Sequence, residues 1–183
     1  MNSSTPSPVL TSILSHLATR SVTPIRQLEH EPSGTSADSA RVRGEPIEHG
    51  AKALLIKLDD GFALFVLSAA RQFDSGAVKK RLGTKKNRFA SKEELLELTG
   101  LVPGSVPPFG RPVLPFDLYV DESIPPLPRV AFNAGSLTDS LILETKDYLR
   151  AAEPKAIFGF SSPAASPGAA ASSAPSAAHA PTL

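Results

Sequence analysis

The chain has 183 residues, of which 41% are hydrophobic, and a formal net charge of +1. This length suits one domain with a single core, and so small a net charge excludes a protein that attracts nucleic acid by its overall field. The absence of cysteine excludes disulfides, thiolate metal ligands and a cysteine nucleophile, and no apolar run has the roughly 20 residues that a membrane-spanning helix needs.

The N-terminal half predicts one amphipathic helix and then mainly strands. Apolar residues recur at helical spacing from Val9 to Leu17. Further along, Asp59-Asp60-Gly61 separates two apolar runs of strand length and predicts a hairpin turn. The expected elements here are a strand over 25–30, a helix over 36–42, and strands over 53–58 and 62–67.

In the second half, helices and strands alternate irregularly. Ser91 and Glu94 have the spacing of a capping box, which predicts a helix that begins there and ends at Gly100. The other expected elements are helices over 76–82 and 145–152 and strands over 87–90, 113–120, 129–133 and 141–144. This order predicts an α+β (mixed α/β) fold, with a mixed, mostly antiparallel sheet surrounded by helices.

Composition divides the chain into three parts. Residues 1–8 are expected to be a flexible N-terminus, and residues 9–158 a single folded domain. Residues 159–183 are mainly Ala, Ser, Pro and Gly without any charged residue. Such a segment has too little apolar surface to offset its ordering entropy, so a disordered tail is predicted.

No familiar catalytic motif is present, and the four histidines are widely spread with no carboxylate cluster beside them, so neither a metal nor a cofactor is expected. The remaining candidates are Lys52 at a strand edge, the Gly- and Pro-rich segment 99–110, and the small residues of 132–136. On these residues alone, Lys52 is read as a lysine whose head snorkels to solvent. The two segments are read either as walls of a ligand pocket or as a rigid connector and a plain turn.

Seven features follow one another in the order typical of the YbaK/prolyl-tRNA synthetase-associated domain, which the chain resembles over about residues 25–149. They are Lys52 before a strand, the Asp-Asp-Gly hairpin, the basic helix Lys79-Lys80-Arg81, the helix of 90–100, Gly104-Ser-Val-Pro-Pro-Phe-Gly110, Tyr119-Val-Asp-Glu-Ser123 and Phe132-Asn-Ala-Gly-Ser136. An ordered set is more specific than any single motif.

The resemblance implies a free-standing trans-editing aminoacyl-tRNA deacylase. Such an enzyme hydrolyses the ester of a small mischarged amino acid on tRNA-Pro or a similar tRNA. Its substrate and partner is aminoacyl-tRNA, and a synthetase as a second partner stays open. Lys52 matches the functional lysine of the family, and Gly104 to Pro108 matches its G-x-x-x-P loop, so Lys52 is the expected catalytic residue. The expected substrate-binding residues are His30, Gly104, Ser105, Val106, Pro107, Pro108, Phe109, Asn133, Gly135 and Ser136.

A basic segment supplies the expected tRNA contacts, Lys79, Lys80, Lys85, Lys86 and Arg88, although a solvated helix face explains these charges equally well. The main alternative function is a non-catalytic module of the same fold that binds tRNA or a synthetase. Binding of a small nucleotide is a third. The expected location is the cytoplasm, with import into an organelle left open.

Overall fold

The computed structural model describes residues 7–164, which contain five α-helices and ten strands. The helices are α1 (Pro8–Thr19), α2 (Ser36–Arg43), α3 (Ser75–Leu82), α4 (Lys92–Thr99) and α5 (Thr145–Ala152), with a 3₁₀ turn η1 (Ile47–His49). The strands are β1 (Arg26–Glu29), β2 (Ala51–Leu58), β3 (Gly61–Ser68), β4 (Arg71–Phe73), β5 (Arg88–Phe89), β6 (Asp117–Asp121), β7 (Arg129–Asn133), β8 (Asp139–Glu144), β9 (Ala156–Phe158) and β10 (Ser161–Pro163).

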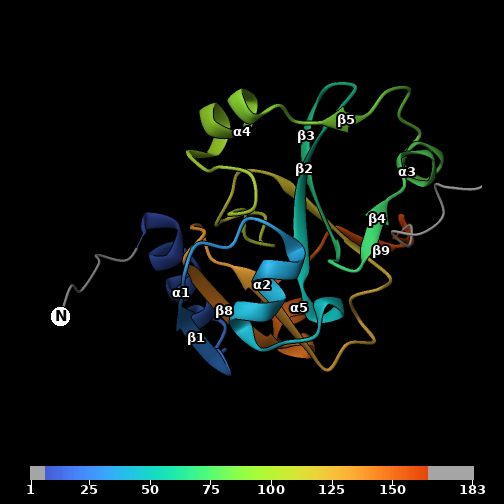
Figure 1. Ribbon diagram of the computed structural model, residues 1–183. Helices are drawn as coiled ribbons and strands as arrows, with labels where there is room; N and C mark the ends of the chain where they lie inside the picture. The colour runs from blue at the N-terminus through green and yellow to red at the C-terminus, as the bar shows by residue number, and fades with distance from the viewer. Residues whose placement is uncertain (1–6, 165–183) are drawn as a thin grey trace, which may run out of the picture.

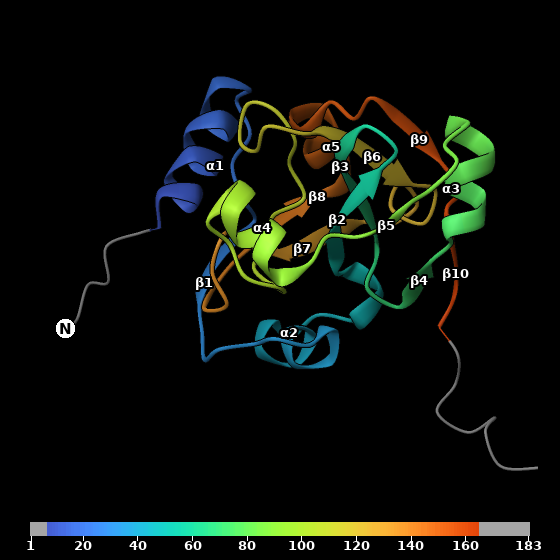
Figure 2. The same ribbon diagram turned by 90° about the horizontal axis from the view of Figure 1, so that it is seen from above.

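The predicted α+β class is confirmed, although the described strands form three sheets and not one. The largest has the order β5-β2-β3-β6-β9; its first three strands are antiparallel, and β6 and β9 run parallel to β3. An antiparallel sheet has the order β1-β8-β7, and β4 pairs with β10. A bridge between Gly50 and Ala131 brings the start of β2 beside β7. Figure 2 shows α1, α2, α3 and α5 arranged around these sheets.

The long β2–β3 hairpin runs through the centre of the molecule (Figure 1), and buried side chains pack on both of its faces. Because side chains alternate along a strand, Leu64 and Val66 enter one hydrophobic cluster, whereas Phe65 and Leu67 enter another. Burial on both faces explains why β3 is an almost continuous apolar run. The hairpin turn predicted at Asp59–Gly61 is confirmed, since Leu58 pairs with Gly61.

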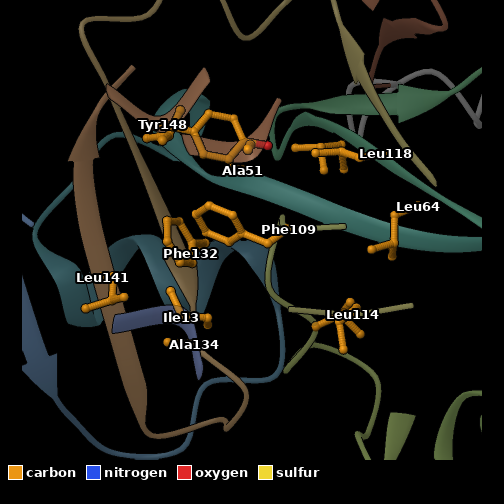
Figure 3. Close-up of a cluster of buried hydrophobic side chains, with 14 of the residues drawn as sticks. Ile13, Ala51, Leu64, Phe109, Leu114, Leu118, Phe132, Ala134, Leu141 and Tyr148 are labelled. Carbon is orange, nitrogen blue, oxygen red and sulfur yellow. The ribbon is translucent and has the colours of Figure 1, made fainter. Parts of the chain in front are cut away.

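The larger cluster has an aromatic centre that anchors the proline-rich loop (Figure 3). Phe109 packs edge-to-face on Phe132 and Tyr148, with ring centroids 5.6 and 5.5 Å apart. The buried hydroxyl of Tyr148 donates to the carbonyl of Pro108 at 2.9 Å. Burial raises the pKa of this phenol far above its ordinary value. The loop after α4 is therefore held in the core at its C-terminal end.

Helix α4 begins and ends at the residues that the capping box and Gly100 predicted. The Ser91 hydroxyl accepts the N–H of Glu94 at 3.1 Å, and the Glu94 carboxylate accepts the N–H of Ser91 at 2.9 Å, which is a capping box. Gly100 ends the helix with φ +71°, a conformation that glycine adopts without steric penalty.

The predicted strand over 113–120 is wrong in its first half. Proline lacks the N–H that a central strand needs, and Pro112 and Pro115 keep the segment irregular until β6 begins at Asp117. The N-terminal boundary also moves, because Ser7 caps α1 by accepting the N–H of Leu10 at 3.0 Å. Residues 1–6 of the predicted flexible segment lie outside the described residues.

The C-terminal boundary predicted at residue 159 is five residues too early. Phe160 is fully buried, and Ser161–Pro163 form β10. The carboxylate of Asp121 accepts the N–H of Phe160 and the hydroxyl of Ser161, both at 2.7 Å, and Arg71 donates to Ser161. Burial acts to raise the pKa of Asp121, but the hydrogen bonds outweigh it and hold that pKa below its ordinary value. The rest of the predicted tail, 165–183, lies outside the described residues.

Two truncations test this boundary. Truncation after Phe160 removes β10 and several hydrogen bonds that contribute about 1 kcal/mol each, so we expect the melting temperature to fall by about 4–8 °C. Truncation after Ala164 removes only the uncharged Ala/Ser/Pro segment and is expected to change it by less than about 2 °C. Thermal unfolding followed by circular dichroism compares the two. Equal melting temperatures would show that β10 contributes nothing to stability.

Candidate functional site

A cavity of about 220 Å³ lies where the first half of β2 faces α2, β7 and the loop after α4. β3 pairs with one edge of this stretch, but within residues 7–164 no strand pairs with the opposite edge, because β5 reaches only Ile56 and Lys57. Four predicted site residues line the cavity, namely Lys52, Gly104, Val106 and Asn133. The other lining residues are Gly34, Thr35, Ser36, Ser39, Arg43, Gly50, Ala51, Ala53, Leu54, Ala69, Ala131 and Phe132.

Lys52 is half-buried near the start of β2 and is not an exposed strand-end lysine. It pairs with Leu67 across the hairpin and projects from the same face of the sheet. Its ammonium group donates to the carbonyl of Arg71 at 2.7 Å, and burial lowers the pKa of Lys52. The remaining two ammonium hydrogens have no hydrogen-bond partner among residues 7–164. This lysine keeps donors available for a ligand.

The backbone of β2 supplies further polar groups at the cavity. The carbonyl of Leu55 accepts the N–H of Ala90 at 2.9 Å and so points away from β3. Alternate residues of an antiparallel strand direct their N–H and C=O groups to the same side, so Ala53 also directs its backbone groups to this uncovered edge. A ligand in the cavity can therefore meet both a backbone donor and an acceptor.

The loop from Pro103 to Val106 forms a second wall. Gly104 has φ +88°, and a Cβ atom there would come within 3.3 Å of both the Gly34 carbonyl oxygen and a methyl group of Leu137. The side-chain amide of Asn133 donates to the Gly104 carbonyl at 2.8 Å and to the Ser33 carbonyl at 3.3 Å. Asn133 thus fixes two chain segments beside the cavity, and Gly104 allows their close approach.

Arg43 is a cavity residue that the sequence reasoning missed. It is only 5% exposed and extends from the end of α2 to the Asn133 side-chain oxygen, at 2.6 Å, and to the Ser140 hydroxyl, at 2.9 Å. The one available signal is that α2, SADSARVR, has no apolar stripe. A helix without such a stripe must be attached through polar contacts, which indicates that one of its charged side chains is buried.

Several predicted substrate-binding residues do not line the cavity. Phe109 and Pro107 are buried with the core, and the carbonyl of Pro108 is taken by Tyr148. The carbonyl of Ser105 accepts the N–H of Gly135, and a Cβ on Gly135 would collide with Val9 of α1 at 2.6 Å. Two more residues have local partners: Ser136 caps the turn before β8, and His30 bonds Ser140.

The lining residues of this cavity include no carboxylate, histidine or cysteine. The cavity therefore lacks the carboxylate and imidazole groups that most often serve as general bases. Burial lowers the pKa of Lys52, whose ammonium group donates a hydrogen bond to the Arg71 carbonyl. The groups present can bind, orient and polarise a ligand. Such a site suits a substrate whose reacting bond is already activated, so that the protein needs only to orient the reacting groups.

A second hollow, of about 600 Å³, lies at the far end of the β2–β3 hairpin and is basic. Its lining residues are Lys57, Leu58, Asp59, Lys79, Lys85, Lys86, Asn87 and Arg88. Four of the five predicted tRNA contacts therefore come together, whereas Lys80 is exposed on α3 and lies outside this basic cleft. Asp59 offsets only part of this charge, because it is the one carboxylate among these lining residues. Its carboxylate accepts the backbone N–H groups of Lys85 and Lys86, both at 2.7 Å, and these bonds lower its pKa.

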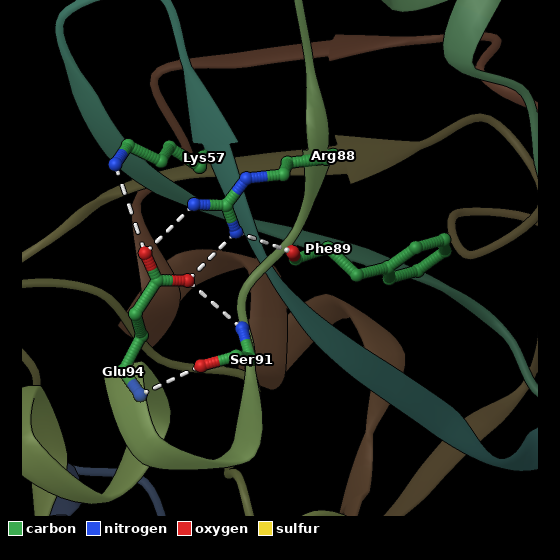
Figure 4. Close-up of polar contacts among 5 residues, drawn as sticks. All are labelled: Lys57, Arg88, Phe89, Ser91 and Glu94. Carbon is green, nitrogen blue, oxygen red and sulfur yellow. Dashed lines mark hydrogen bonds and ion pairs between the residues drawn. The ribbon is translucent and has the colours of Figure 1, made fainter.

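Glu94 neutralises one side of the basic cleft (Figure 4). Its carboxylate accepts two hydrogen bonds from Arg88, at 2.7 and 2.8 Å, and lies 3.6 Å from the ammonium group of Lys57. Arg88 and the Ser91 N–H lower the pKa of Glu94 to about 2, so it stays ionised at neutral pH. By contrast, Lys79, Lys85 and Lys86 form no ion pair within residues 7–164.

A small cavity without carboxylate or histidine and a basic cleft are both compatible with a small group attached to an anionic polymer. Comparison with known proteins agrees. The family model "Aminoacyl-tRNA editing domain" matches residues 30–151, and the chain belongs to this family. Editing domains hydrolyse the ester of a wrongly attached amino acid, so the predicted enzyme class, an aminoacyl-tRNA deacylase, is confirmed as well.

Two curated relatives and two solved structures illustrate the likeness. The multifunctional Ser/Thr-tRNA deacylase ProXp-y of Escherichia coli K12 is 36% identical over 72% of this chain and 81% of its own. The proline–tRNA ligase of Shouchella clausii is 32% identical over 55% of this chain but only 18% of the ligase. A proposed trans-editing enzyme for prolyl-tRNA synthetase superposes with a TM-score of 0.70 at 26% identity, covering 83% of this chain and 96% of its own. The hypothetical protein APE2540 gives 0.73 at 23% identity, covering 82% and 99%.

Proposed function

We propose that this deacylase removes serine or threonine from mischarged tRNA, and that the cavity beside β2 is the place of hydrolysis. One observation carries the assignment: Lys52, the Gly104 loop and Asn133 meet around a single cavity. The deacylase of Escherichia coli, 36% identical, acts on Ser-tRNA and Thr-tRNA according to its name, which supports the choice of amino acids.

The size of the cavity favours a small aminoacyl group. Its volume of about 220 Å³ lies below the roughly 300–1,000 Å³ of pockets that hold drug-sized ligands. Its walls include three hydroxyl side chains, Thr35, Ser36 and Ser39. The hydroxyls of Thr35 and Ser39 already donate to Asp38 and Ser33, so they can accept a hydrogen bond from a hydroxyl on the substrate side chain. A synthetase pocket discriminates against a near-isostere by only about 1–3 kcal/mol, so some tRNA is mischarged. A second site that accepts small polar residues can hydrolyse that mischarged tRNA.

In the proposed reaction, water adds to the ester carbonyl, the bond to the ribose oxygen breaks as that oxygen takes up a proton from the water, and free amino acid and deacylated tRNA leave. The ester is already activated, so the protein contributes placement and charge stabilisation. Lys52 supplies a partly desolvated cation, and the uncovered backbone of Ala53 supplies a donor and an acceptor. With no carboxylate or histidine lining the cavity, a backbone carbonyl or a substrate hydroxyl positions the attacking water.

The basic cleft is proposed to contact phosphates of the acceptor stem. Such contacts position an RNA without reading its sequence, and the three lysines without an ion pair are the available groups. The same reaction places the protein where tRNA is charged, in the cytoplasm or a translating organelle. Because the matched segment also occurs inside proline–tRNA ligases, a synthetase is a candidate partner.

Removing two of these lysines tests the contact. We expect the double variant Lys85→Ala/Lys86→Ala to raise KM about 10-fold at low salt with little change in kcat, because phosphate contacts contribute to binding. The difference should shrink at 0.5 M salt, where such contacts are screened. Lys92→Ala/Lys146→Ala, which removes two exposed lysines outside the cleft, serves as the control. Equal KM values for the two double variants would show that the basic cleft is a solvated surface that does not contact tRNA.

A panel of mischarged tRNAs tests the function itself. Seryl- and threonyl-tRNA are expected to be hydrolysed at least 10-fold faster than tRNA carrying a large side chain such as phenylalanine, because the cavity cannot hold the larger group. Rates are measured under single-turnover conditions as release of the labelled amino acid. Binding of every tRNA without release would identify a non-catalytic module of the same fold.

A further inference from the structure

Arg43 is the most buried cation of the described residues, and the proposed reaction does not use it. Its side chain reaches from α2 to the wall of the cavity and is only 5% exposed. The three groups that accept its hydrogen bonds are the Ser140 hydroxyl, the Ala131 carbonyl and the Asn133 side-chain oxygen, all of them neutral. Burial lowers the pKa of Arg43 to about 10, which leaves it charged at neutral pH.

The hydrogen bonds of Arg43 leave capacity for a ligand. A guanidinium group has five N–H donors, and three are used: Nε donates to Ser140, Nη1 to Ala131 and Nη2 to Asn133, at 2.9, 3.4 and 2.6 Å. The other two have no hydrogen-bond partner among residues 7–164. A planar fork with free donors matches the oxygens of a carboxylate or a phosphate.

The charge balance at the cavity also favours an anionic ligand. Arg43 and Lys52 both line it, and neither forms an ion pair with any carboxylate of residues 7–164. A buried cation without an anion is expensive in free energy. The cavity thus holds two cations whose charge an anionic ligand would compensate.

We infer that Arg43 forms a binding site for a phosphate ester, in the cavity that Lys52 also lines. The inference rests on the proposed function for the identity of this phosphate ester. In a mischarged tRNA it is the phosphodiester that precedes the terminal adenosine. At that end of an aminoacyl-tRNA the ester is neutral and the amino group is basic, so the phosphodiester is the anion available. Arg43 then orients the 3' end while Lys52 and the β2 backbone face the ester.

Nucleotide binding tests the site without requiring catalysis. The probes are 5'-AMP, adenosine and inorganic phosphate, titrated into the full chain by calorimetry. We expect 5'-AMP to bind at least 10-fold more tightly than adenosine, and Arg43→Gln to remove that difference. Arg41→Gln is the matched control, because Arg41 lies on the same helix but is exposed and pairs with Glu31 at 2.9 Å. Equal affinity for 5'-AMP in wild type and Arg43→Gln would overturn the inference.

A second variant keeps the test decisive if Arg43→Gln fails to fold. Asn133→Asp retains Arg43 but places a carboxylate where its neutral partner now accepts at 2.6 Å, so an internal ion pair replaces the ligand. The variant also removes the amide that donates to the Gly104 carbonyl, so its adenosine affinity, expected to equal that of wild type, reports whether the cavity keeps its shape. We expect the same loss of 5'-AMP binding, and undiminished binding would contradict the site.

Kinetics distinguish the source of the phosphate. If the phosphodiester of tRNA occupies the site, Arg43→Gln raises KM for seryl-tRNA about 10-fold, and an unchanged KM would remove Arg43 from substrate binding. Tighter binding of inorganic phosphate than of 5'-AMP would also refute the ester assignment. A wild-type protein that binds 5'-AMP through Arg43 but hydrolyses no aminoacyl-tRNA would refute the proposed function and leave the phosphate-ester site standing.

Discussion

Replacing Lys52 by alanine is expected to lower the single-turnover rate of seryl-tRNA hydrolysis by about 100-fold, the scale observed when one preorganised electrostatic group is removed from a site. Lys52 is half-buried, its ammonium group is held by the Arg71 carbonyl, and it lines the cavity. Removing it takes away a cation that no other side chain of β2 can replace, because Lys57 lies at the basic cleft.

Two comparisons separate this effect from a loss of structure. Lys146→Ala removes an exposed lysine of α5 that pairs only with Glu144, and its rate should equal that of wild type. Lys52→Met keeps the length of the side chain without its charge and should be as slow as Lys52→Ala, with an unchanged urea midpoint. A Lys52→Ala variant that retained more than half of the wild-type rate would remove this lysine from the reaction.

The second large effect is expected at Gly104. Valine there must adopt φ near +88°, and its Cβ would come within 3.3 Å of the Gly34 carbonyl oxygen and of Leu137. The left-handed conformation costs about 1–2 kcal/mol for an L-residue, and the contacts force apart the two segments that Asn133 joins. We therefore expect Gly104→Val to remain folded but to lose at least 50-fold in rate on seryl- and threonyl-tRNA alike.

Gly100→Val provides a control for backbone strain. Gly100 has φ +71°, similar to that of Gly104, but a Cβ there would meet no atom within 4 Å. The Gly100→Val variant should therefore lose about as much stability in urea as Gly104→Val while keeping most of the deacylase activity. Equal rates for the two variants would mean that the Gly104 loop is a connector and not a wall of the site.

The features that sequence predicts best are those in which the signal and the structure are close together in the chain. The Asp59–Gly61 turn and the capping box of Ser91 and Glu94 depend on residues within four positions of each other, and both form as predicted. Strands β4, β9 and β10 were missed, because pairings between distant segments, such as Arg71 with Pro163 and Tyr119 with Ala156, leave no local pattern. Tertiary pairing fixed those strands.

The residues of the site likewise fall into those that the sequence predicted and those that only the fold reveals. The resemblance directed attention to Lys52, Gly104, Val106 and Asn133, which the fold brings around one cavity. It could not separate them from neighbours that serve the core, such as Phe109, because adjacent residues of a loop can point to opposite sides. Arg43 contacts Asn133 across 90 positions of sequence, a distance over which no spacing argument operates.

The most direct test of the account is to locate the substrate on the protein. A minihelix that carries serine through an amide bond, which this enzyme cannot hydrolyse, is titrated into isotope-labelled protein while backbone amide signals are recorded by NMR. We predict shifts at the cavity, including Ala53, Gly104 and Asn133, and at Lys85 and Lys86 in the basic cleft, with the cavity shifts absent when the minihelix carries no serine. Shifts confined to other surfaces, or cavity signals that do not respond to the serine, would contradict the assignment of this cavity as the place where the ester is hydrolysed.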